Sequence, residues 1–203
     1  MKNLVVRVDR KRGAYPEYTL EDAIATIFLL KTPLGRKQIA EKLELGEGTV
    51  RTLLRKLSNL GIIGSRQRGH FLTEKGEKLK AKLNESFLDP IGVSVDGWPA
   101  VAIIVKNPPK FKSIELRDEA IRFDAKGAMI LTVRNGEIVF PEDSRPLKET
   151  YPEIVRKLMN YEEGDAIIIA WAETPPKALK AAIHVAVFMK EKDLPGELLE
   201  VVR

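Results

Sequence analysis

Basic side chains that could contact a polyanion recur within a short stretch of the first half of the chain. Arg51 and Arg55 lie four residues apart, and Arg66 and Arg68 follow on either side of a single glutamine. Arginine offers a rigid fork of N–H donors that fits phosphate oxygens and the major-groove edge of guanine, and threonine can bond a base or contact a thymine methyl group. The candidate residues for contact with DNA are Gly48, Thr49, Arg51, Thr52, Arg55, Lys56, Arg66 and Arg68.

The spacing of apolar residues predicts helices that would position this set. A helix over residues 47–59 would bury four side chains at helical spacing and leave the candidates on its open sides. Those four are Val50, Leu53, Leu54 and Leu57. Two helices are expected before it, one between Thr19 and Pro33 and one over residues 36–43. The tight connection at residues 44–46 would join the last two helices into a helix-turn-helix.

A β-hairpin with a basic tip is expected over residues 62–72, because apolar residues flank Arg66-Gln67-Arg68-Gly69. Thr73 should then cap a fourth helix over residues 74–87. From such a tip, the two arginines could reach phosphates or a minor groove. The alternative for each basic residue is an ordinary solvated surface charge.

The segments 46–63 (GEGTVRTLLRKLSNLGII) and 71–76 (FLTEKG) resemble winged-helix transcription regulators of the MarR and ArsR type. The resemblance covers about residues 18–87. It implies that the third helix enters the major groove and that the hairpin forms a wing. Glu47 counts against this, since a carboxylate near phosphates repels them, although it favours the positive end of its own helix.

Charge and composition limit the remaining possibilities. Residues 1–88 carry 18 Lys and Arg against 10 Asp and Glu, whereas residues 89–203 carry 16 against 19. A basic front half suits nucleic acid and an acidic back half suits a different partner. Without cysteine and with only two histidines, cysteine or histidine-rich metal sites are excluded. No signal peptide and no membrane span are expected, so the compartment should be the cytoplasm. The high Lys and Glu content fits a heat-stable protein.

The back half reads as a second domain. Pro90 ends the fourth helix and marks the boundary between domains 1–88 and 89–203. Two hairpins are expected around Asp96-Gly97 and Asn135-Gly136. The element order ββαββαβα predicts an α+β fold, specifically a two-layer sandwich with helices on one face of an antiparallel sheet. Ser113, a capping box at Thr150-Tyr151-Pro152-Glu153, and Thr174 should begin its helices.

This layout is similar to small β(2)-α-β(2)-α domains such as the GAD domain of bacterial aspartyl-tRNA synthetase. Together with the segments 116–121 and 126–128, it also resembles an uncharacterised archaeal family that combines a winged helix with such a domain. No catalytic motif accompanies the resemblance, so no enzyme, cofactor or metal is expected. Arg117, Asp118, Arg122 and Asp124 could form a small-molecule pocket or be surface ion pairs.

The last helix, residues 175–189, is apolar on nearly every side except for a stripe that contains an exposed His184. Two surfaces must cover it, the sheet and either a second subunit or the front domain. We expect a DNA-binding transcriptional regulator that is a homodimer through its back domain, which could also sense a small-molecule effector. The alternatives are an RNA- or tRNA-associated protein and an enzyme with an unrecognised pocket.

Residues 1–17 allow three interpretations. Residues 4–8 could form a strand and residues 9–13 a basic arm near DNA, or the whole segment could be a solvated tail. His70 should lie in a strand of the hairpin, and a role as a pH switch is the less favoured alternative.

Overall fold

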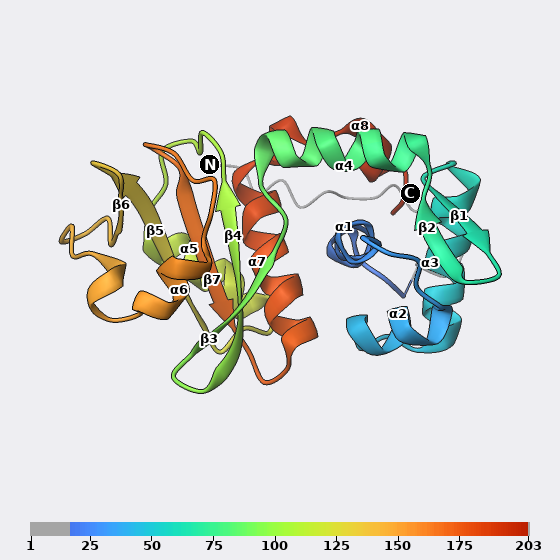
Figure 1. Cartoon of the computed structure of the whole chain (residues 1–203), viewed down its shortest axis with the longest axis horizontal. Coiled ribbons are helices and arrows are strands. Elements are labelled where there is room, and N and C mark those ends of the chain that lie inside the picture. The colour runs from blue at the N-terminus through green and yellow to red at the C-terminus, as the bar shows by residue number, and fades with distance from the viewer. Residues whose placement is uncertain (1–16, 203) are drawn as a thin grey trace.

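The computed structural model describes residues 17–202, so the strand and basic arm expected before residue 17 lie outside the described part. The fold is a mixed α+β arrangement in which a helical front half and a sheet-containing back half lie side by side (Figure 1). The front half contains α1 (Leu20–Leu29), α2 (Arg36–Leu43), α3 (Glu47–Asn59), β1 (Ile63–Arg66), β2 (Gly69–Leu72) and α4 (Glu74–Ser86). All six elements match the sequence prediction in type and order.

Local chemistry explains where these helices begin and end. Thr19 and Asp22 form a reciprocal capping box at the start of α1, and Thr73 accepts a hydrogen bond from the Gly76 amide at the start of α4. Gly61 takes a positive φ of 72° directly after α3, as a helix-ending glycine does. Every residue from Glu21 to Phe28 is buried, so α1 is a core helix rather than an amphipathic one.

The back half is built on a five-stranded antiparallel sheet with the strand order β3-β4-β7-β5-β6. Its strands are β3 (Ile91–Val95), β4 (Trp98–Val105), β5 (Gly127–Arg134), β6 (Glu137–Val139) and β7 (Ala166–Trp171). Both expected hairpins are present, and the turn residues Asp96, Gly97, Asn135 and Gly136 all have positive φ. This is the geometry of the type I′ turns that Asp-Gly and Asn-Gly favour.

The helices of the back half are α5 (Ser113–Arg122), α6 (Pro152–Lys157), α7 (Pro175–Met189) and the short α8 (Gly196–Leu199), with 3₁₀ turns η1 (Leu147–Glu149) and η2 (Glu191–Asp193). Helices α5 and α7 cover one face of the sheet, whereas Leu147 and Ile154 pack on the other. The two-layer prediction is therefore wrong in this detail. Helices cover both faces, which explains why β7 is buried from Ala166 to Ala170.

Two expected caps are also absent. Lys112 occupies the N-cap position of α5, so Ser113 is its first helical residue. At α6 the N-cap is Tyr151 and no side chain caps the helix. The capping box fails because Thr150 ends the preceding 3₁₀ turn, where its amide donates to the carbonyl oxygen of Leu147. The Thr174 cap of α7 is present, with the Lys177 amide as its donor.

Helix α7 lies between the sheet and α1, which joins the two halves (Figure 1). Ile183 and Val187, which a dimer interface on this helix would have covered, are thereby buried within a single chain, whereas Phe188 is 51% exposed. The front domain therefore supplies the second surface that this helix requires. Of the two coverings that the sequence left open, a second subunit or the front domain, the structure therefore shows the front domain.

The C-terminal segment returns to the front half and closes its core. Helix α8 packs against α1, and the Tyr18 hydroxyl donates to the carbonyl oxygen of Val201 over 3.0 Å. Lys82 of α4 forms an ion pair with Glu197 of α8. One continuous set of buried side chains runs from Tyr18 to Val201. Among the described helices, none is long and apolar enough to cross a membrane.

Candidate nucleic-acid interface

Helix α3 separates its side chains into a buried face and an exposed face, as predicted. Val50, Leu53, Leu54 and Leu57 are buried in the core of the front half. Gly48, Arg51 and Arg55 are exposed, whereas Thr49, Thr52 and Lys56 are half-buried at the edges of the exposed face. The helix therefore presents two arginines to solvent on a rigidly packed support.

The two threonines of α3 are already engaged. The Thr52 hydroxyl donates to the carbonyl oxygen of Gly48 over 3.2 Å. The Thr49 hydroxyl donates to the Glu17 carboxylate over 2.7 Å. Each hydroxyl must exchange this bond before it can donate to a base, although its oxygen can still accept a bond, so the arginines are the stronger candidates. The contact with Glu17 could not be found from the sequence, because a separation of 32 residues leaves no periodic signal.

The acidic residue that counted against DNA binding is also paired. The Glu47 carboxylate forms an exposed ion pair with Arg36 of α2 over 3.3 Å. Both side chains lie where α2 and α3 meet, at the connection that Glu44 turns with a φ of 49°. The positive charge of Arg36 offsets that of Glu47, although such an exposed pair contributes little to stability.

The β1–β2 hairpin extends from the same end of the molecule as α3 (Figure 1). Arg66, Gln67 and Arg68 at its tip are all exposed, and the Arg66 guanidinium lies 4.5 Å from the centre of the Phe71 ring. A cation above a ring is held in place without losing its charge. The helix and the hairpin that carry the predicted arginines thus lie at one end of the molecule.

Backbone bonds hold this hairpin against the loop between α1 and α2. The amide of Leu34 donates to the carbonyl oxygen of His70 over 3.0 Å, and the amide of His70 donates back to Leu34 over 2.8 Å. Gly69 has a φ of +122°, and a Cβ there would lie 2.5 Å from the Leu34 backbone. Burial, and then the charge of Arg36, lower the pKa of His70, so its imidazole is neutral at pH 7 and belongs to the support of the hairpin.

His184 differs from its prediction and links three helices. It was expected on an exposed stripe, but its imidazole is 23% exposed and stacks on Phe123, the residue after α5, with ring centres 4.3 Å apart. Its Nδ1 lies 2.9 Å from the Glu21 carboxylate of α1, and its Nε2 lies 3.6 Å from the Glu119 carboxylate of α5. The pair with Glu21 therefore joins the front half to the back half.

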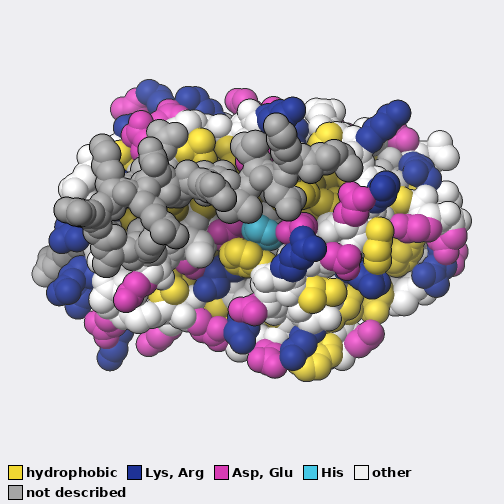
Figure 2. All heavy atoms as spheres, turned by 180° about the vertical axis from the view of Figure 1, so that it is seen from behind, with side chains coloured by type: hydrophobic (Ala, Val, Ile, Leu, Met, Phe, Trp, Pro, Cys, Tyr) yellow, Lys and Arg dark blue, Asp and Glu magenta, His cyan; other side chains and the backbone are white. Residues whose placement is uncertain are grey.

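The surroundings of His184 are acidic and partly enclosed. Figure 2 shows the back of the molecule, where acidic and basic side chains are interspersed and one histidine lies between acidic side chains. Burial disfavours the imidazolium, but the hydrogen bond and charge of Glu21, followed by those of Glu119, outweigh it and raise the pKa of His184. For Glu21, burial acts against the charged form, but the bond to His184 and its own backbone amide lower its pKa.

These shifts predict a pH-dependent stability. A raised histidine pKa stabilises the fold below the unfolded value of about 6.5, and a lowered glutamate pKa does so above about 4.3. The contribution of the pair is therefore complete between these values and is lost as pH rises through the raised pKa of His184. In urea unfolding, His184→Gln should lose the most stability relative to the parent near pH 6 and progressively less above pH 7.

His70→Gln is the matched control, because the pKa of His70 is lowered rather than raised. Its native state binds fewer protons than the unfolded state, so its contribution to stability increases as pH rises toward about 6.5. The two variants should therefore show opposite pH trends. Parallel curves for the parent and His184→Gln between pH 6 and pH 8 would contradict the assignment of the charged pair.

The charged residues of α5 do not converge on one pocket. Arg122 pairs with Glu119, Arg117 lines a hollow between α5 and β5, and Asp124 opens into a different hollow beside α7. Asp118 is exposed. Within residues 17–202, no group of three or more acidic or histidine side chains could hold a metal ion. These residues are thus surface charges rather than a common site.

Comparisons with known proteins find a family match in each half of the chain. Residues 19–78 match the family of PH0730-like N-terminal domains, and residues 95–189 match a domain of unknown function, DUF4443. The hypothetical protein PH0730 from Pyrococcus horikoshii OT3 is 69% identical over 92% of this chain and 100% of its own, with a TM-score of 0.89. No curated protein matches. The chain therefore belongs to the family of P. horikoshii PH0730, in which a PH0730-like N-terminal domain precedes a DUF4443 domain.

Proposed function

We propose that residues 18–87 form a winged helix-turn-helix domain that binds double-stranded DNA, and that the protein is a transcriptional regulator. The observation that carries the proposal is that α3 and the β1–β2 hairpin lie at one end of the molecule (Figure 1), and that Arg51 and Arg55 on the helix and Arg66 and Arg68 on the hairpin are all exposed. In winged-helix proteins of this layout, a recognition helix reads base edges while flanking basic residues contact phosphates.

The local geometry supports this arrangement. Helices α2 and α3 pack against each other across a connection of three residues, and the hairpin follows α3 directly. The buried side of α3 and the Leu34–His70 bridge hold helix and hairpin against the same core. A support of this kind reduces the conformational freedom that binding would otherwise remove.

The direct test measures binding of the full chain to duplex DNA and to structured RNA over a range of salt concentrations. A preferred sequence selected from random duplexes should be bound more tightly than unrelated duplexes, and affinity should fall with salt as phosphate contacts release counterions. Tighter binding to structured RNA than to any duplex would favour the RNA-associated alternative. Affinity that does not depend on salt would contradict the basic surface as the site.

The hairpin should contribute mainly through phosphates. Replacing Arg66 and Arg68 together by alanine should weaken binding about equally on all duplexes and reduce the slope of log affinity against log salt by about 0.9 for each lost contact. Arg145→Ala is a suitable control, because Arg145 also lies over an aromatic ring, that of Phe140, but in the back half. A salt slope unchanged in the double variant would mean that the hairpin does not touch DNA.

The predicted homodimer does not depend on a second subunit covering α7, because recognition of two half-sites is a separate reason to expect it. One winged helix covers one half-site, and two-fold symmetric regulators gain specificity by binding two half-sites about one helical turn apart. We therefore propose that two copies bind a palindromic operator through their front halves, with contacts between back halves. Analytical ultracentrifugation at micromolar concentration should find a dimer. A monomer that binds a palindromic duplex tightly, with one copy per duplex, would rule the dimer out.

A further inference from the structure

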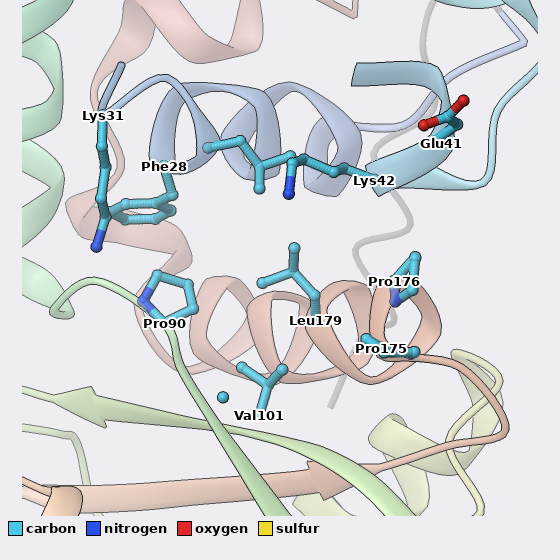
Figure 3. Close-up of a pocket in the computed structure, with 11 residues that line it drawn as sticks. Phe28, Lys31, Glu41, Lys42, Pro90, Val101, Pro175, Pro176 and Leu179 are labelled. Atoms are coloured by element: carbon cyan, nitrogen blue, oxygen red, sulfur yellow. The ribbon is translucent and has the colours of Figure 1, made fainter. Parts of the chain in front are cut away.

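A cavity of about 510 Å³ lies between the two halves of the chain (Figure 3). Helices α1 and α2 form one side, and α7 with strands β3 and β4 and the Pro90 segment forms the other. This volume falls within the roughly 300–1,000 Å³ of cavities that hold small molecules, and boundaries between domains are a preferred place for them. The cavity lies apart from the exposed face of α3.

The lining is mainly apolar. Phe28 and Leu179 lie on opposite sides of the cavity, and Pro90 lies at the end nearest Phe28 (Figure 3); Leu29 and Val101 are also in the lining. Leu29 and Leu179 are only partly buried, so apolar surface at the boundary between the halves remains accessible to solvent. A bound apolar group would cover this surface and gain free energy in proportion to the area removed from water.

The charges around the cavity favour an anion. The Lys42 ammonium points toward Leu179, whereas the Glu41 carboxylate is turned away from the centre of the cavity (Figure 3). Within residues 17–202, Lys42 has no carboxylate within ion-pair distance. At the other end, Lys31 and Lys80 share the single carboxylate of Asp89, each at 3.0 Å. The charged residues that line the cavity are therefore two lysines, Lys31 and Lys42, and one glutamate, Glu41.

We propose that this cavity binds a small amphipathic anion. Its apolar body lies between Phe28 and Leu179, and its single carboxylate, or a group of similar charge, accepts hydrogen bonds from Lys42. Charge-assisted bonds of this kind are the strongest that a lysine makes, and they fix which end of the ligand faces α2. Because α1 and α2 belong to the front half and α7 to the back half, the ligand contacts both.

The test uses the full chain without DNA, so its result does not depend on the proposed DNA binding. Decanoate and decan-1-ol are the probes, because they share an apolar chain and differ in the charge of the head. Titration calorimetry should find that decanoate binds about tenfold or more tightly than decanol, the difference expected from one charged hydrogen bond.

Two variants locate the site. Lys42→Gln should weaken decanoate binding about tenfold and leave decanol unchanged, whereas Lys37→Gln, an exposed lysine on the same helix outside the cavity, should change neither. Leu179→Trp should weaken binding of both probes, because the larger side chain fills part of the cavity beside Phe28. Circular dichroism checks that each variant is folded, and if Leu179→Trp is not folded, the two lysine variants decide.

The proposal fails if decanoate does not bind the parent protein, or if a folded Leu179→Trp binds it as tightly as the parent does. Equal affinity for decanoate and decanol would contradict the proposal that the ligand carries an anionic head group. An equal loss of affinity in Lys42→Gln and Lys37→Gln would mean that general surface charge, rather than this cavity, attracts the probe.

Discussion

Replacing Arg51 and Arg55 together by alanine is expected to abolish sequence preference and to weaken binding to the selected duplex by about 2–6 kcal/mol, since a base-reading arginine contributes roughly 1–3 kcal/mol. Both side chains are exposed on α3, so their removal leaves the buried face of the helix intact. The effect should therefore appear in DNA affinity and not in the free energy of unfolding. Fluorescence anisotropy with selected and scrambled duplexes measures it.

A matched control removes the same charge elsewhere. Lys78→Ala combined with Arg117→Ala takes two exposed cations from α4 and α5 and should change affinity only slightly, through long-range attraction. If both double variants lose the same affinity, the exposed face of α3 has no special role. If neither loses sequence preference, α3 is not the element that reads DNA.

Gly76→Ala should be strongly destabilising, although alanine ordinarily favours a helix over glycine by about 1 kcal/mol. A Cβ at this position would lie 2.1 Å from the carbonyl oxygen of Ile62, a backbone atom that cannot move aside as a flexible side chain could. Overpacking of this kind typically costs about 1–3 kcal/mol and here requires α4 to shift away from the end of β1. Urea unfolding monitored by circular dichroism measures the loss.

Gly48→Ala is the opposite case within the same half. Gly48 lies in α3, and a Cβ there would meet no atom within 4 Å. The substitution should stabilise the fold by roughly 0.4–1 kcal/mol, because it restricts the unfolded chain without a clash. The critical result is that the two substitutions change the free energy of unfolding in opposite directions. A Gly76→Ala protein as stable as the parent would show that α4 does not approach β1 as closely as described.

Much of the fold could be predicted because its signals are local. Asp96-Gly97 and Asn135-Gly136 specify their turns through residues that tolerate positive φ, and Thr19 and Thr73 mark helix starts by hydrogen bonds within three residues. The failure at Thr150 has the same physical origin. Its amide is used by a competing local structure, the 3₁₀ turn before it, which the spacing of residue types alone does not reveal.

The parts that escaped prediction depend on contacts between distant segments. The pair of Glu21 with His184 spans 163 residues, and the bond of Tyr18 to Val201 spans 183. The pattern of α7 correctly required two covering surfaces, yet it could not choose between a second subunit and α1 of the same chain. The exposed arginines of α3 were correctly located, since their exposure follows from the buried face of one helix.

The burial of α1 has a consequence for how the protein is made. Every residue of this helix from Glu21 to Phe28 is buried, and two of the elements that cover it, α7 and α8, are translated long after it. At about 5–20 residues per second, a ribosome needs roughly 7–29 s for the 145 residues between the end of α1 and the start of α7. During that interval the nascent front half has no partner for one side of its most apolar helix. The front half can therefore complete its core only after α7 and α8 have left the exit tunnel.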